Sequence, residues 1–453
     1  MVLKSINPYT LQTEAEYTTF SKVQIDQALI LAQKAYLDWR QTSFSKRRDL
    51  LLQVAQLLRS KKDELARLIT TEMGKVLTES HAEIEKCANH CQYFATHSET
   101  FLQDVTVQTK AHRSLISFEP IGAVLAIMPW NYPFWQVFRY LAPTLMAGNV
   151  SLLKHAPNVI GCGIAIEKLL HEAGFPIGAF QHLILNTNDI EQIIQADIVR
   201  GVTLTGSESA GSSVATLAGK HIKKSVLELG GSDPFIVLKD ADTAKAAHVA
   251  VQSRFLNAGQ ACICAKRFIV VTEVFDDFIQ AFQKEMQSYK QGDPLNPHIK
   301  VGPMARIDLA QKLKSQLDHS VAKGARILVG GEVSQCAFTP TLVDRILPEM
   351  VIFQEETFGP LAAILRVNHP QEAIYIANQS RYGLAASLWT NDIEQAYHLA
   401  RKIEAGNVFV NSLAYSDSKL PFGGIKKSGF GRELSDYGQK EFTNIKTIVI
   451  EEA

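Results

Sequence analysis

The chain has 453 residues, and its 46 Lys and Arg residues are balanced by 46 Asp and Glu residues, so the formal net charge is zero. Hydrophobic residues make up 46% and charged residues 20%, a globular composition that excludes extended disorder. The balanced charge argues against nucleic acid or an acidic membrane surface as partner. A chain of this length has room for roughly two or three domains.

The cysteine content and the apolar runs predict a cytoplasmic protein. Six cysteines are too few for a disulfide scaffold in so long a chain, which favours a reducing compartment. The longest apolar run, residues 121–130, is too short to cross a bilayer. Residues 1–8 lack the apolar core of a signal peptide and the Arg- and Ser-rich pattern of a transit peptide.

The first hundred residues predict helices. Apolar residues recur every three or four positions from Leu51 to Ile69, and Gly74 is placed to end this helix. Ser45 stands before the run and is a candidate N-cap. A more polar helix is predicted over residues 76–102. Residues 105–118 that follow are polar and favour β-structure, which predicts an exposed ribbon whose edge needs a partner.

From residue 121 onward, short apolar runs alternate with helical stretches. The first series of predicted strands covers residues 121–127, 150–153, 182–185, 202–205 and 226–229. The second series covers residues 235–238, 268–271, 326–329, 361–367, 384–389 and 407–410. Strands that alternate with helices predict parallel, doubly wound sheets, and two series of similar size predict two α/β layers.

The glycine-rich segments contain no standard phosphate-binding motif. Residues 161–166 begin as G-x-G but lack the third glycine of the dinucleotide fingerprint. Residues 206–213 have the glycine spacing of a P-loop, but serines stand where Lys and Ser or Thr are required. Taken alone, both segments indicate turns and helix starts.

Cys262 is the first candidate for chemistry, because it follows Asn-Ala-Gly-Gln near a predicted helix start. Backbone N–H groups at such a place would lower the pKa of the thiol and favour the thiolate. The alternative is a buried structural cysteine, the commoner state inside cells. The residues by themselves leave both interpretations open.

Three further polar residues follow predicted strands. Glu228 stands between two leucines, and burial there would raise the pKa of its carboxyl toward the value that a general base needs. The alternative is an acid at the end of a strand with no catalytic role. Asn131 lies in a turn between two prolines, and its side-chain amide is able to donate a hydrogen bond to an oxyanion. The alternative is an ordinary turn residue. Lys154 is within reach of a ribose or phosphate, or is a solvated lysine.

Together these segments resemble the aldehyde dehydrogenase superfamily over nearly the whole chain. The matching motifs occur in the family's order and spacing: P-W-N-Y-P at 129–133, L-L-K-H-A at 152–156, T-G-S at 205–207, L-E-L-G-G at 227–231, G-Q-A-C at 259–262, Q-E-E-T-F-G-P at 354–360, N-V-F-V-N at 407–411 and P-F-G-G-I-K-K-S-G at 421–429. The resemblance implies an α/β fold with a Rossmann-like cofactor domain, an α/β catalytic domain and a small β oligomerisation element.

The resemblance also implies a role for each matching residue. Cys262 is the implied nucleophile and Glu228 the general base, while Asn131 and the Cys262 N–H form the implied oxyanion hole. The residues implied to bind NAD(P) are Trp130, Lys154, Pro157, Gly206, Ser207, Glu356 and Phe358. The implied reaction passes through a thiohemiacetal and a thioester on the cysteine, and the glutamate activates the water that hydrolyses the thioester.

The implied substrate is succinate semialdehyde, because residues 128–139, 152–158, 229–235 and 428–433 resemble the bacterial succinate semialdehyde dehydrogenase branch. In that branch the arginine at position 139 pairs with the distal carboxylate of the substrate. The forked guanidinium group of arginine suits the two oxygens of a carboxylate. Leu256 stands where some members carry a second arginine, leaving Ser416 and Ser418 as helpers of Arg139. Glutarate semialdehyde, another small aldehyde, or a cofactor-independent thiol esterase activity are the alternatives.

The cofactor is NADP or NAD, with a slight preference for NADP. Pro157 stands where NAD-preferring relatives often carry a glutamate, so no carboxylate there repels a 2′-phosphate. Cys264 is a redox candidate, because a C-x-C at this place in the family is able to form a disulfide; a packed thiol is the alternative. Cys87, His90 and Cys91 share a helix without a second ligand pair, so no metal site is predicted.

The resemblance implies boundaries for three parts of the chain. The NAD(P)-binding domain is expected over residues 1–101 and 121–230, and the catalytic domain over 231–430. Residues 102–120 and 431–453 are expected to form the oligomerisation element, whose strand would pair with a neighbouring copy. The expected assembly is a homodimer or a dimer of dimers.

Overall fold

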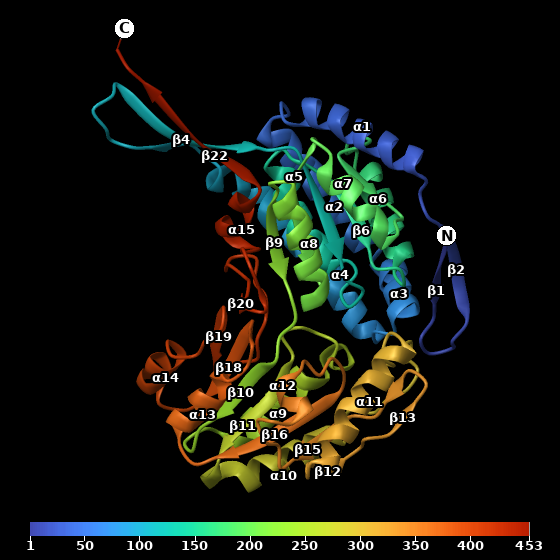
Figure 1. The fold of residues 1–453 in the computed structure, drawn as a ribbon, viewed down its shortest axis with the longest axis vertical. Helices are drawn as coiled ribbons and strands as arrows, with labels where there is room; N and C mark the ends of the chain where they lie inside the picture. The colour runs from blue at the N-terminus through green and yellow to red at the C-terminus, as the bar shows by residue number, and fades with distance from the viewer. Residues whose placement is uncertain (453) are drawn as a thin grey trace.

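Two mainly parallel sheets organise the chain, of which the computed structural model describes residues 1–452. The strand order is β21-β9-β8-β5-β6-β7 in the six-stranded sheet and β12-β15-β16-β11-β10-β18-β19 in the seven-stranded sheet. Each sheet forms the centre of its own lobe (Figure 1). The predicted α/β class, with two α/β layers, is confirmed.

The six-stranded sheet is built by β5 (Ala123–Met128), β6 (Val150–His155), β7 (Phe180–His182), β8 (Val199–Thr205), β9 (Lys224–Glu228) and β21 (Gly429–Phe430). All neighbouring pairs are parallel except β9 and β21. The helices of this lobe are α1 (Lys22–Trp39), α2 (Phe44–Ser60), α3 (Lys62–Met73), α4 (Leu77–Phe101), α5 (Trp135–Met146), α6 (Ile160–Glu172), α7 (Ile190–Gln195), α8 (Glu208–Lys220) and α15 (Ser435–Glu441).

The seven-stranded sheet is built by β10 (Asp233–Val237), β11 (Ala265–Val271), β12 (Arg326–Val329), β15 (Thr341–Asp344), β16 (Leu361–Val367), β18 (Ala385–Trp389) and β19 (Asn407–Val410). Only β12 runs antiparallel to its neighbour. The helices of this lobe are α9 (Thr243–Phe255), α10 (Phe275–Met286), α11 (Ile307–Ala322), α12 (Val351–Gln354), α13 (Pro370–Asn378) and α14 (Ile393–Ala400).

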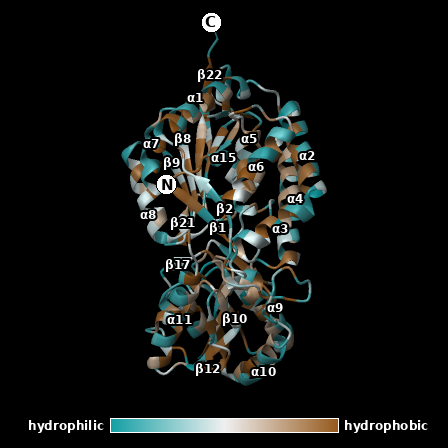
Figure 2. Cartoon of the chain, turned by 90° about the vertical axis from the view of Figure 1, so that its right-hand side faces the viewer, coloured by the Kyte–Doolittle hydropathy of each residue, from teal (hydrophilic) through white to brown (hydrophobic). Residues whose placement is uncertain are grey.

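Apolar side chains from the strands form the interior of both lobes. Leu125 and Leu152 are fully buried in the first lobe, as are Phe235 and Phe268 in the second. Burying a side chain of this size stabilises the fold by about 1.5–3 kcal/mol. Figure 2 shows the strongest hydrophobic colour on the central strands, while the helices carry hydrophilic faces outward.

A three-stranded ribbon leaves the first lobe as an arm (Figure 1). Its strands are β3 (Val105–Thr106), β4 (Arg113–Pro120) and β22 (Thr443–Ile450), in the order β22-β4-β3. The expected ribbon over 105–118 is therefore present, and its long strand β4 pairs on both edges within the same chain. The outward residues Ile445 and Val449 of β22 are more than half exposed.

Three local predictions are wrong. The run up to Gly74 forms two helices, α2 and α3, and Ser43 caps the first one: its hydroxyl accepts from the Lys46 N–H at 3.3 Å, whereas Ser45 already lies inside the helix. Strand β7 ends at His182, where a strand was expected to begin. The hairpin of β1 (Val2–Ile6) and β2 (Thr13–Thr18) was not predicted.

Several short elements complete the fold. They are β13 (Val333–Ser334), β14 (Ala337–Phe338), β17 (Tyr382–Gly383), β20 (Ile425–Lys426) and the 3₁₀ turns η1 (Thr187–Asp189), η2 (Leu256–Gly259) and η3 (Thr272–Val274). None of the helices within residues 1–452 combines the length and the apolar character that a membrane span requires.

Candidate active site

The candidate site begins where the order of the first sheet reverses, between β5 and β8. In such sheets, ligands bind outside the carboxyl ends of the strands at this point. Trp130 and Asn131 follow β5, and Gly206 and Ser207 follow β8. These residues line a cavity of about 770 Å³. Its other walls include Cys262, Glu356 and Phe358 from the second lobe.

Asn131 is buried and held in place by hydrogen bonds to the segment before Cys262. Its Nδ2 donates to the carbonyl oxygen of Gln260 at 2.9 Å, and Asn257 Nδ2 donates to the Asn131 carbonyl oxygen at 2.8 Å. The turn that carries Asn131 is anchored by Glu83, whose Oε1 accepts from the N–H groups of Phe134 and Trp135, both at 2.9 Å. The carboxylate thereby satisfies the open N–H groups at the start of α5.

Cys262 does not lie at a helix start, so the predicted cause of a lowered pKa is wrong. The chain passes through η2 with Asn257 and Ala258 in the left-handed region (φ 51° and 53°), then enters β11 at Ala265. Partial burial in the cavity wall raises the pKa of Cys262 to about 12, although Arg139 and other nearby cations oppose this rise. The thiol is therefore protonated in the resting site at neutral pH.

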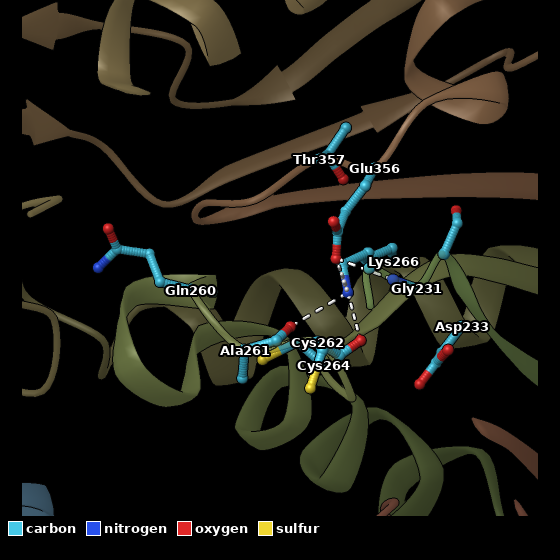
Figure 3. Close-up of polar contacts among 12 residues, drawn as sticks. Gly231, Asp233, Gln260, Ala261, Cys262, Cys264, Lys266, Glu356 and Thr357 are labelled. Atoms are coloured by element: carbon cyan, nitrogen blue, oxygen red, sulfur yellow. Dashed lines mark hydrogen bonds and ion pairs between the residues drawn. The ribbon is translucent and has the colours of Figure 1, made fainter. Parts of the chain in front are cut away.

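Lys266 lies directly behind Cys262, and the sequence reasoning did not identify it. Its buried ammonium donates to the carbonyl oxygens of Ala261 at 3.1 Å and Cys262 at 2.6 Å, and lies 3.3 Å from Glu356 Oε1 (Figure 3). The same carboxylate oxygen accepts from the Gly231 N–H at 3.0 Å. Lys266 thus links the cysteine loop to Glu356.

Glu228 lies at the end of β9 and is 2% exposed. Burial raises the pKa of its carboxyl well above the usual range, as predicted from the neighbouring leucines. Arg139 opposes this rise, because its Nη2 lies 4.0 Å from Glu228 Oε2, whereas the buried carboxylate of Glu433 reinforces it. Glu433 is a second residue that the sequence reasoning missed.

Arg139 is buried between α5 and the end of β9. Its Nε is ion-paired with Glu433, and its Nη2 donates to Thr205 Oγ1 at 3.3 Å. Across residues 1–452 the structure gives Nη1 no hydrogen-bond acceptor. The guanidinium is thus held on one side by internal carboxylates, and its role toward a substrate stays a prediction.

Ser416 and Ser418 lie in the loop that closes against α4. Lys86 Nζ donates to Ser416 Oγ at 2.7 Å, and His90 Nδ1 lies 2.7 Å from Ser418 Oγ. The other ring nitrogen of His90 lies 3.3 Å from the carbonyl oxygen of Arg139. His90 thus links Ser418 to the backbone of Arg139, and the cooperation of the two serines with the Arg139 guanidinium stays a prediction.

Most of the predicted cofactor residues meet in one place. The ring centroids of Trp130 and Phe358 are 5.8 Å apart at nearly a right angle. Ser207 caps the 13-residue helix α8, whose free N–H groups and dipole suit a phosphate. The cavity walls therefore carry the aromatic, carboxylate and phosphate-binding groups that a dinucleotide requires.

Two predicted cofactor residues lie outside the walls of this cavity. Lys154 is the penultimate residue of β6, and burial lowers the pKa of its ammonium. Pro157 lines a separate cavity of about 450 Å³ beneath the N-terminal hairpin, together with Asn158 and Arg306. The structure therefore places Pro157 apart from the other predicted contacts.

Cys264 and the remaining cysteines are free thiols. Cys264 is buried, and its Sγ lies 3.6 Å from the Leu256 carbonyl oxygen. Burial also raises the pKa of the Cys264 thiol, which disfavours the thiolate that disulfide formation needs. The redox role of Cys264 stays a prediction. Within the described chain no group of three or more His, Cys, Asp or Glu side chains is placed to hold a metal ion.

Comparison with known proteins agrees with this arrangement. The model of the aldehyde dehydrogenase family matches residues 1–448. The probable NADP(+) succinate-semialdehyde dehydrogenase of Synechocystis sp. is 45% identical over 453 residues, which cover 99% of this chain and 100% of that protein. Succinate semialdehyde dehydrogenase Sad of Escherichia coli K12, named for NAD(P)+, is 42% identical and covers 98% of this chain and 97% of its own.

A solved structure shows the same fold. Succinic semialdehyde dehydrogenase from Streptococcus pyogenes, in complex with NADP+, matches with a TM-score of 0.97 and 36% identity over 99% of this chain and 100% of that one. The family model matches almost the whole sequence, and Asn131 and Cys262 line the cavity, whereas Glu228 is buried just before the wall residues Leu229 and Gly230. The chain therefore belongs to the aldehyde dehydrogenase family.

Proposed function

We propose that the protein oxidises succinate semialdehyde to succinate with NAD(P). The observation that carries this proposal is the cavity at the switch point, where a cysteine, an oxyanion donor and cofactor-shaped walls meet, in a chain 42–45% identical to proteins named succinate-semialdehyde dehydrogenase. The NADP in the names of the relatives favours the same cofactor here.

The proposed chemistry starts at Cys262. Once solvent water has accepted the thiol proton, the thiolate attacks the aldehyde carbon and forms a thiohemiacetal, whose oxyanion accepts from Asn131 Nδ2 and from the Cys262 N–H. Before the substrate arrives, the same amide donates to the Gln260 carbonyl oxygen, which holds it in orientation. NAD(P), when bound, would supply the hydride acceptor that converts the thiohemiacetal into a thioester on the cysteine.

Glu228 is proposed as the base for hydrolysis. Its carboxylate removes a proton from the water that attacks the thioester carbonyl, and the thiolate of Cys262 leaves. Burial supports this role, since a raised pKa brings the carboxyl closer to the working pH. Of the cofactor contacts, Glu356 and Lys154 are proposed for the riboses, Phe358 and Trp130 for the nicotinamide side, and the start of α8 for the pyrophosphate.

Arg139 is proposed as a ligand of the substrate carboxylate, with Ser416 and Ser418 beside it. Its Nη1 is the edge of the guanidinium that the protein itself leaves open. Its Nε is already paired with Glu433, so the proposed contact with the substrate is a single charge-assisted hydrogen bond from Nη1.

We also propose the functional division of the chain. Residues 1–101 and 121–230 bind the cofactor, and 231–430 carry the cysteine, although β21 at 429–430 pairs with the first sheet. Residues 102–120 and 431–453 form the oligomerisation element, supported by the unpaired outer edge of β22. Deleting residues 443–453 is expected to reduce the particle mass measured by light scattering; an unchanged mass contradicts the proposal.

The test is a comparison of initial rates with succinate semialdehyde and with butyraldehyde, which has a methyl group in place of the carboxylate. We expect reduced cofactor to form with a kcat/KM at least about tenfold higher for the acid, equivalent to about 1.4 kcal/mol. Equal values contradict the substrate assignment. Absence of cofactor reduction with both aldehydes contradicts the proposed reaction, and ester cleavage without cofactor then favours the esterase alternative.

A further inference from the structure

Lys86 is a partly buried cation that the predicted site does not use. It lies on α4, one turn before His90, and both side chains reach the loop that carries Ser416 and Ser418. Burial lowers the pKa of His90 to about 3, so its ring is neutral. The Arg139 carbonyl only accepts, so His90 Nε2 donates to it and Nδ1 accepts from the Ser418 hydroxyl.

The side chain of Lys86 is fixed in position from two directions. Its Nζ donates to Ser416 Oγ at 2.7 Å and lies 4.1 Å from the ring centroid of Trp135. The ring of His90 also packs against Trp135, with centroids 5.1 Å apart in an edge-on arrangement. A long, flexible side chain held this way has already lost much of the entropy that binding an anion would cost.

The charge of Lys86 has no counterion in the protein. Among residues 1–452 no carboxylate oxygen lies within 4.0 Å of its Nζ, whereas neighbouring Arg139 is paired with Glu433. Burial and the repulsion from Arg139 lower the pKa of Lys86 to about 8. A buried cation without a partner is costly, and that cost is removed when an anion binds beside it.

Ser416 supplies the second donor. Its oxygen accepts from Lys86, so its hydroxyl proton remains available to a ligand. Lys86 and Ser416 therefore present one ammonium and one hydroxyl donor side by side, next to Arg139 on α5. This pattern matches the two oxygens of a carboxylate.

We propose that Lys86, together with Ser416, binds the distal carboxylate of the substrate and thereby selects short aldehyde acids over neutral aldehydes. The proposal rests on the proposed function and names a specificity-determining residue for it. Arg139 supplies the inner cation, held by Glu433, and Lys86 the outer cation, which has no internal partner.

The experiment compares Lys86→Gln, Lys86→Arg and the control Lys168→Gln, which removes an exposed lysine on α6, in the full-length protein. KM and kcat are measured for succinate semialdehyde and for butyraldehyde. We expect Lys86→Gln to raise KM for the acid about tenfold and to leave both constants for butyraldehyde within about twofold. Lys86→Arg restores most of the affinity, and Lys168→Gln matches the wild type.

Each other outcome overturns the inference. If Lys86→Gln changes both aldehydes equally, Lys86 has a structural role only; if it changes neither, Lys86 does not contact the substrate. These results are distinct from a failure of the proposed function, in which the wild type itself does not prefer the acid.

A measurement on the wild type covers the case in which Lys86→Gln does not fold. The ratio of KM for the acid to KM for butyraldehyde is followed from pH 7 to pH 9.5. The ratio is expected to rise above about pH 8, where Lys86 loses its charge. The charged and titratable groups that face Lys86 are Glu83 and Cys87 on α4, Arg139 on α5 and Asp417 in the loop. A constant ratio overturns the inference.

Discussion

Lys266 Nζ donates to the carbonyl oxygen of Cys262 at 2.6 Å, so a buried ammonium lies directly behind the proposed nucleophile. The positive charge lowers the pKa of the Cys262 thiol against the larger effect of burial, which raises it. The same ammonium lies 3.3 Å from Glu356 Oε1. One side chain thereby connects the nucleophile loop with a proposed cofactor ligand.

Replacing Lys266 with Met tests this connection. Removing the cation is expected to raise the pKa of Cys262 further and to slow its alkylation by iodoacetamide at pH 8, because less thiolate is present. KM for the cofactor is also expected to rise, since Glu356 loses a partner. The control is Lys245→Met, on the exposed surface of α9. An alkylation profile equal to that of the wild type contradicts this interpretation.

Replacing Cys262 with Ala is expected to abolish aldehyde oxidation, with a loss of at least about a thousandfold, because no other group is placed to form the thioester. Formation of reduced cofactor is the measurement. The matched control is Cys336→Ala, a buried cysteine that lines the separate cavity under the N-terminal hairpin. Full activity of the Cys262 variant contradicts the assignment of the nucleophile.

Replacing Glu228 with Gln is expected to lower the steady-state rate about 100- to 10,000-fold, while a first burst of reduced cofactor remains. The burst persists because hydride transfer precedes the hydrolysis that needs the base. Rapid mixing measures both phases, and mass spectrometry detects the acyl group on Cys262. Loss of the burst together with the steady rate assigns Glu228 to an earlier step.

The pH dependence of the wild type follows from the environment of Glu228. Burial raises its pKa above the usual carboxyl range, and only the deprotonated form acts as a base. Deacylation is therefore expected to increase with pH through the raised pKa, on the alkaline side of the range of an exposed glutamate. Single-turnover decay of the acyl enzyme from pH 5 to pH 9 measures it. A rate that is already constant above pH 5.5 contradicts the raised pKa.

Replacing Asn131 with Ala removes the amide donor at the proposed oxyanion hole. The expected result is a fall in kcat of about 100- to 1000-fold with a smaller change in KM, because the oxyanion exists only after attack. Asn158→Ala is the control, since Asn158 lies in the other cavity. A rise in KM with unchanged kcat places Asn131 in ground-state binding.

Much of the sheet architecture follows from local patterns. Apolar runs such as Leu361–Val367, which is mostly buried, and Asn407–Val410, which is partly buried, have the bounds that the sequence predicted, because parallel strands covered by helices need continuous apolar residues. Strand β7 was displaced because its three residues include Gln181 and His182, which carry no apolar signal. The hairpin of β1 and β2 was missed because its polar, mostly exposed strands lack an apolar run.

The sequence by itself determined the family and the two α/β layers, and it predicted the roles of Cys262, Glu228 and Asn131, because these depend on motifs and on local periodicity. Only the tertiary structure decided the electrostatic surroundings of these residues. Lys266 contacts Glu356, Glu433 contacts Arg139, and Lys86 contacts Ser416, and each contact joins residues that are far apart in the sequence. Burial sets the strength of each effect. Periodicity reports which face of an element is buried, but not which charges the fold brings together.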